Sequence, residues 1–98
     1  MGKATLVMHN KILLSNGVVV EIKIWDVSND ARYPNCYKYS LFAVHRGEIL
    51  VGYDNHHPKG GHRHMDDKEE EYHFTTLENL KNDFKSDLEV QIAKRGLG

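Results

Sequence analysis

Four of the seven histidines in this 98-residue chain lie within residues 56–64, together with Lys59 and Arg63. An imidazole can take or give a proton near neutral pH, and a cationic side chain can neutralise charge that gathers on a phosphate. If the segment is extended, His62 and His64 share one face and Arg63 lies on the other. The pattern therefore favours acid and base catalysis on a phosphodiester by His62 and His64.

RNA suits this chemistry because its 2′-hydroxyl is a built-in nucleophile. Asp54 would orient a histidine by accepting its second ring N–H, and Lys59 and Arg63 would bind phosphate. An exposed Tyr53 would stack on a base. Each proton-transfer group contributes about 10²- to 10⁴-fold, so the mechanism needs no metal or other cofactor.

Two other interpretations of residues 54–66 stay open. In the first, the loop is a non-catalytic interaction module or a solvated Gly-rich connection. The second is a metal site built from alternating side chains and one more histidine: His62, His64 and Asp66, completed by His56 or His57. Neighbouring Lys59 and Arg63 would repel a cation at that site.

The elements that must position these residues are mostly strands. Alternating and β-branched residues predict four strands, at residues 5–14, 18–27, 37–45 and 48–53, joined by turns that include Asn16-Gly17 and Arg46-Gly47. Residues 71–74 are a candidate fifth strand. Thr75, as N-cap of a capping box with Glu78, begins a helix with one apolar stripe: Leu77, Leu80, Phe84, Leu88 and Ile92. We expect an α+β fold, an antiparallel meander of four to five strands with one C-terminal helix packed on one face.

The composition is that of one small domain, residues 1–98, with 40% hydrophobic and 28% charged residues. Such a chain buries about 60–65% of its unfolded surface, so we expect an active site at the surface and Trp25 and Phe84 in the core. The net charge of −1 does not advertise nucleic-acid binding, and five of the 14 acids fall in residues 66–71. That run is expected to be solvated, to contact a basic partner, or to cover the basic loop as a nucleic-acid mimic.

Cys36 is the only cysteine, so the chain has no intrachain disulfide. This usage suits a reducing compartment. The apolar run at residues 4–8 is too short for a signal peptide or a membrane span. We expect a cytoplasmic protein with no membrane partner.

Ordered pieces along nearly the whole chain resemble the TumE-type toxins of type II toxin–antitoxin modules. The resembling pieces are Asn16-Gly17, Glu21 to Trp25, Lys38 to Leu41, Tyr53-Asp54-Asn55, Lys59-Gly60, His62-Arg63-His64, Tyr72, Phe74, Leu80 and Asp83-Phe84. The chain departs from the family pattern at His56-His57-Pro58, which favours His62 and His64 as the essential histidines.

The resemblance implies a small toxin that is bound by a helix-turn-helix antitoxin. Its signature positions imply a site that includes Tyr53, Asp54, Asn55, Lys59 and Arg63. Analogy to other small toxins of this type implies cleavage of RNA. Since an open sheet leaves unpaired edges, we also expect the antitoxin, or a second copy in a homodimer, to add along an edge strand.

Overall fold

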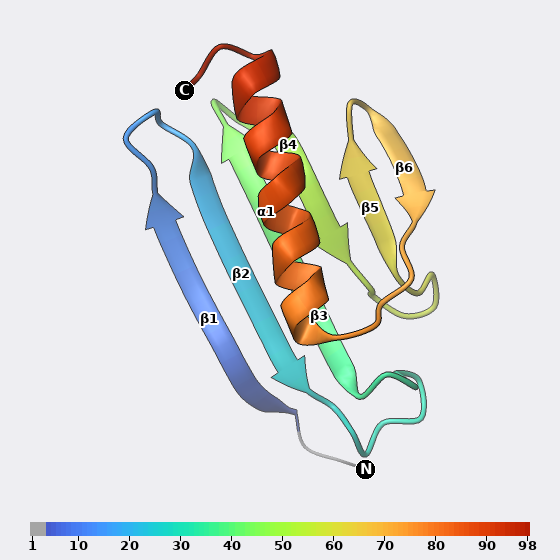
Figure 1. Cartoon of the computed structure of the whole chain (residues 1–98). Helices are drawn as coiled ribbons and strands as arrows, with labels where there is room; N and C mark the ends of the chain where they lie inside the picture. Colours follow the sequence, from blue (N-terminus) through green and yellow to red (C-terminus); the bar gives the residue numbers. More distant parts are fainter. Residues whose placement is uncertain (1–3) are drawn as a thin grey trace.

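Six antiparallel strands form one sheet in the computed structural model, which describes residues 4–98, and one helix packs on one face of it (Figure 1). Each strand pairs with its neighbours in chain order, so the sheet is a meander. The elements are β1 (Thr5–Leu13), β2 (Val19–Asp26), β3 (Tyr37–His45), β4 (Glu48–Asp54), β5 (His62–Met65), β6 (Lys68–Glu71) and α1 (Leu77–Lys94). The expected α+β meander with a C-terminal helix is confirmed, and the number of strands is corrected from four or five to six.

The two predicted tight turns have the backbone that their residues favour. Gly17 lies at φ +86°, and the side chain of Asn16 accepts a hydrogen bond from the Val18 N–H at 3.0 Å. Arg46 and Gly47 both have positive φ. Two positive φ values match the right-handed twist of the flanking strands, so this turn fixes the β3–β4 hairpin.

The hairpin of β5 and β6 was missed, because residues up to 64 were expected to be a loop and residues 71–74 a strand. The turn between β5 and β6 consists of Asp66 and Asp67, at φ 55° and 60°. Aspartate tolerates this left-handed conformation better than most residues. Because β6 is fully exposed and charged, it lacks the apolar alternation by which a strand is predicted.

The helix buries the predicted stripe against the sheet. Leu80, Phe84 and Leu88 are buried. The helix begins one residue later than predicted, because the Thr76 hydroxyl, not that of Thr75, accepts the Asn79 N–H at 3.0 Å. Thr75 instead accepts from the Asn79 side chain, so the expected capping box with Glu78 does not form.

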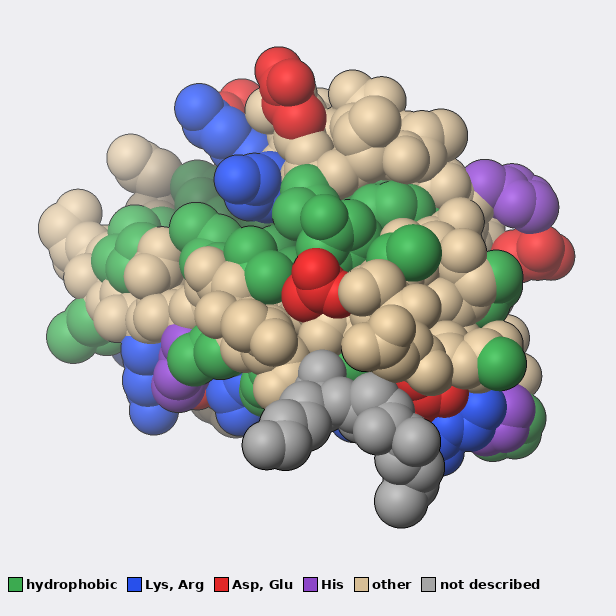
Figure 2. Space-filling model, turned by 90° about the horizontal axis from the view of Figure 1, so that it is seen from below, with side chains coloured by type: hydrophobic (Ala, Val, Ile, Leu, Met, Phe, Trp, Pro, Cys, Tyr) green, Lys and Arg blue, Asp and Glu red, His purple; other side chains and the backbone are tan. Residues whose placement is uncertain are grey.

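The core lies between the helix and one face of the sheet, visible as a band of hydrophobic side chains in Figure 2. Val20 of β2 and Ala43 of β3 are cross-strand partners on that face. Alternate residues project to the opposite face. We call this opposite face the open face. Its side chains include Lys23, Trp25, Lys38, Phe42, Asp54, His62 and His64. Trp25 is therefore half-buried outside the core, contrary to expectation.

Candidate active site

Asp54, His62 and His64 meet on the open face, where β4 pairs with β5. Asp54 ends β4 and lies opposite His62 in the β4–β5 register. The Asp54 Oδ1 and His62 Nε2 atoms are 2.9 Å apart, and the two imidazole ring centres are 5.0 Å apart. The alternation predicted for His62 and His64 therefore places both rings beside one carboxylate.

Both ring nitrogens of His62 face acceptors. Nε2 contacts the Asp54 carboxylate, and Nδ1 lies 3.0 Å from the carbonyl oxygen of Gly60. Gly60 has φ +76°, a conformation that a residue with a side chain adopts with strain. A neutral imidazole has one N–H, so only the doubly protonated ring donates to both acceptors. The two acceptors therefore fix the orientation of the His62 ring.

His64 is held more loosely. Its Nδ1 lies 3.8 Å from a carboxylate oxygen of Glu69, which is beyond hydrogen-bond distance, and 36% of its side chain is exposed. By contrast, only 11% of the His62 side chain is exposed. Of the two clustered histidines, His64 is therefore the more accessible to a molecule on the open face.

Strand β6 places carboxylates beside the cationic side chains of the segment. Lys59 donates to Glu69 at 2.8 Å, and Arg63 donates to Glu70 at 2.7 Å. The hydrogen bond from Lys59 lowers the pKa of Glu69 and raises that of the lysine. Because 66% of the Lys59 side chain is exposed, an incoming phosphate could compete with Glu69 for it.

Tyr53 and Arg63 lie on the helix side of the sheet, away from the two histidines. Tyr53 is fully buried, and its hydroxyl donates to Asp87 of α1. Burial raises the pKa of this phenol. The expectation of an exposed Tyr53 that stacks on a base is wrong, because its position in β4 faces the core. Arg63 contacts the same Asp87 at 3.3 Å and therefore lies on the opposite side of the sheet from His62 and His64.

The side chain of Asn55 forms hydrogen bonds with the backbone of β3. It accepts from the Tyr39 N–H at 2.9 Å and donates to the Tyr37 carbonyl at 2.7 Å, which extends the β3–β4 ladder. Asp66 does not join the histidines as the metal-site hypothesis expected. It lies in the β5–β6 turn and accepts from Lys94 at 3.0 Å, so the carboxylate of Asp54 takes its place.

His56 and His57 do not join the cluster either. The backbone N–H of His56 lies 3.4 Å from Asp54 Oδ1, and that of His57 lies 3.3 Å from the Tyr33 hydroxyl. Both residues are exposed. They therefore lie outside the cluster of Asp54, His62 and His64.

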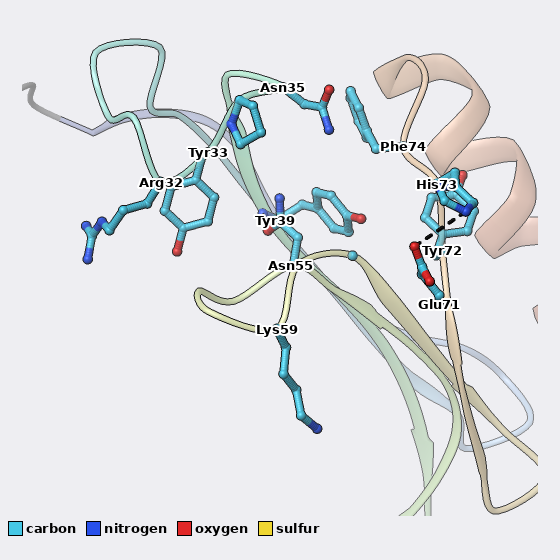
Figure 3. A pocket seen from close by; sticks show the side chains of 13 residues that line it. Arg32, Tyr33, Asn35, Tyr39, Asn55, Lys59, Glu71, Tyr72, His73 and Phe74 are labelled. Carbon is cyan, nitrogen blue, oxygen red and sulfur yellow. Dashed lines mark hydrogen bonds and ion pairs between the residues drawn. The ribbon is translucent and has the colours of Figure 1, made fainter.

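A cavity of about 420 Å³ adjoins the site, between the 28–36 loop, the 55–61 loop and residues 71–74 (Figure 3). Aromatic side chains of Tyr33, Tyr39 and Phe74 form part of its wall. Within the described residues, the Tyr39 hydroxyl is the buried side-chain polar atom that lacks a hydrogen-bond partner. Burial raises the pKa of Tyr39 to about 12, so this hydroxyl stays protonated. Lys59 and Gly61 also line the smaller cavity beside His62.

The sequence profile described as Toxin TumE matches residues 2–92. The chain belongs to this family. Searches of curated proteins and of solved structures found no match. The span matched to TumE includes every candidate site residue, and it confirms the resemblance seen in the sequence. Within residues 4–98, no helix has the length and apolar composition needed to cross a membrane.

Two aromatic residues of the open face were missed as functional candidates. Trp25 was expected in the core, and Phe42 was not singled out. The signal was present in β2, where strict alternation puts Trp25 on the same side as the charged Glu21 and Lys23. An aromatic residue in phase with charged residues indicates the solvent face of a sheet.

Proposed function

We propose that this TumE toxin cleaves RNA, with His64 as general base and His62 as general acid. The observation that carries the proposal is the cluster of Asp54, His62 and His64 on the open face, with one imidazole fixed between two acceptors and the other accessible. Rings 5.0 Å apart can reach two oxygens on opposite sides of one phosphorus.

The steps follow from that geometry. His64 takes the proton of the 2′-hydroxyl, and the 2′-oxygen attacks the phosphorus. The bond from phosphorus to the 5′-oxygen breaks, and His62 gives the leaving oxygen its Nε2 proton, which leaves its hydrogen bond to Asp54 while Nδ1–H stays on the Gly60 carbonyl. Before this transfer, Asp54 holds His62 in orientation and stabilises its positive charge. Lys59 releases Glu69 and binds the phosphate, whose negative charge it neutralises. The products are a 2′,3′-cyclic phosphate and a 5′-hydroxyl end.

A divalent-cation site at the same three side chains is the second candidate. Two imidazoles and one carboxylate form a known ligand set, and the Gly60 carbonyl orients His62 as it would a metal-bound imidazole. However, two ligands of a tetrahedral zinc lie about 3.3 Å apart, given bonds of about 2.0 Å. The 2.9 Å between Asp54 and His62 fits a direct hydrogen bond better.

The end groups of the products and the effect of a chelator distinguish these candidates. We expect the purified protein to cleave a single-stranded RNA in excess EDTA and to leave 2′,3′-cyclic phosphate ends. The same RNA with 2′-O-methyl groups at every sugar is the control and should stay intact. Cleavage that stops in EDTA, returns with zinc and leaves 3′-hydroxyl ends would instead support the cation site.

We further propose that a helix-turn-helix antitoxin binds the toxin in the cytoplasm and adds a strand along β1. Of the two edge strands, β6 is acidic, whereas β1 exposes apolar side chains: Leu6, Val7, Ile12 and Leu13. An exposed apolar edge offers both backbone hydrogen bonds and burial to a partner. The alternative occupant of this edge is a second copy of the toxin.

Hydrogen exchange of the toxin with and without its antitoxin tests this arrangement. We expect amide protection to rise along β1 (Thr5–Leu13) and to stay constant along β6 (Lys68–Glu71). Protection of β1 in the toxin alone, rising with its concentration, would identify a homodimer edge. Unchanged β1 amides in the complex would contradict the proposal.

A further inference from the structure

The strand registers arrange the open face in rows that run across the sheet. One row contains Lys23, Ser40, Asp54 and His62. The adjacent row contains Glu21, Phe42, Gly52 and His64. The two histidines therefore stand at one end of a surface that continues over β3 and β2. Within the described residues, the only helix covers the other face.

The ring of Phe42 lies over Gly52, which pairs with His64 across the two strands. A Cβ atom at position 52 would come within 2.4 Å of the Phe42 ring, so the ring occupies the space where a side chain would stand. Gly52 and His64 are cross-strand partners, which puts the aromatic ring next to the histidine that we assign as the base. Phe42 is only half-buried, so its ring is available to a flat partner.

Trp25 and three lysines extend this surface toward β1. The Lys38 Nζ atom lies 5.8 Å from the centre of the Trp25 ring, in a cation–π contact. Lys23 is partly exposed, and Lys11 is exposed on β1. Glu21 is the acid among them, and it pairs with His9 at 3.2 Å and with Lys23 at 3.8 Å. Figure 2 shows Lys, Arg and His side chains on the side of the sheet away from the helix.

We propose that single-stranded RNA crosses the open face from the two histidines over Phe42 to Trp25, with its phosphates near Lys23 and Lys38. This inference rests on the proposed function and names its substrate class. Aromatic rings can stack only on bases that are not paired in a helix, and lysines between them match the charge of the backbone. Duplex RNA offers no exposed base face to this surface.

Trp25 is the only tryptophan of the chain, so its fluorescence reports on this surface alone. The probe is a single-stranded RNA with 2′-O-methyl groups at every sugar, which binds without being cleaved. We expect saturable quenching, and no comparable quenching by the matching duplex.

Phe42→Leu keeps an apolar side chain over Gly52 and should weaken binding by about 5-fold or more. Lys38→Gln should also weaken binding of the probe. The slope of the logarithm of the binding constant against that of the salt concentration should fall by about one, because one phosphate contact is lost. Lys81→Gln, on the exposed part of the helix, is the matched control and should change neither quantity.

The outcomes separate this inference from the proposed function. If the wild-type toxin cleaves RNA but Phe42→Leu and Lys38→Gln bind the probe like the wild type, the surface assignment is wrong and the cleavage proposal stands. If the probe quenches Trp25 but RNA is never cleaved, the surface assignment stands and the proposed function fails. Quenching by the antitoxin and not by RNA would assign the face to a protein partner and overturn the inference.

Discussion

Replacing His64 with glutamine is expected to lower the rate of RNA cleavage by about 10²- to 10⁴-fold. Glutamine is of similar length and can form hydrogen bonds, but it cannot take a proton from a 2′-hydroxyl. His64 is half-buried and lies 3.8 Å from its nearest carboxylate, so the change removes no strong contact from the fold. The loss should appear in kcat with little change in the binding of uncleavable RNA. Single-turnover cleavage of a labelled RNA measures this effect.

His73→Gln is the matched control for that variant. His73 follows β6, its side chain is 85% exposed, and its contact with Glu71 is a loose 3.5 Å. We expect the His73→Gln variant to cleave RNA at the wild-type rate. Equal rates for His64→Gln and the wild type would remove His64 from the mechanism, whatever the toxicity of the protein.

Replacing Phe84 with alanine is expected to lower the free energy of unfolding by about 3–5 kcal/mol. The Phe84 ring is 3% exposed and packs edge-on against Tyr53 at a centre-to-centre distance of 6.0 Å. Truncation leaves a cavity between α1 and β4, the strand that carries Asp54. Because small domains have only about 5–15 kcal/mol of stability, the variant should lose much of its folded population on mild heating. Urea unfolding followed by circular dichroism measures the change.

Val90→Ala gives the comparison on the same helix. Val90 is 54% exposed, so its truncation should change the unfolding free energy by about 0.5 kcal/mol or less. If Phe84→Ala lowers the free energy of unfolding by no more than Val90→Ala does, the Phe84 ring does not stabilise the packing of the helix on the sheet.

The strands with strict alternation could be predicted closely from the sequence. Residues 37–45 match β3 at both ends, because an irregular loop precedes them and Arg46-Gly47 follows. Strand β6 could not be predicted in this way. Its residues are Lys68 followed by three glutamates, and it is held by hydrogen bonds to β5 and by ion pairs, not by burial. Residues 68–71 therefore form a strand only because β5 pairs with them.

The candidate site was predictable in its histidines but not in its surroundings. Alternation suffices to put His62 and His64 on one side of an extended segment. The carboxylate that joins them depends on the register between β4 and β5, which aligns Asp54 with His62. Asp66 lies in the β5–β6 turn at positive φ and contacts Lys94 of the helix instead. Strand alternation in β4 also places Tyr53 in the core. Its aromatic side chain alone suggested stacking on a base, which its burial rules out.

The roles of His62 and His64 are tested by induced expression of the wild type beside a His62→Ala/His64→Ala double variant. Growth and the integrity of total RNA are scored together. Circular dichroism of both purified proteins must first show equal folding. We expect the wild type to arrest growth and degrade RNA and the double variant to do neither. A folded double variant that still arrests growth and degrades RNA would contradict the assignment of these histidines.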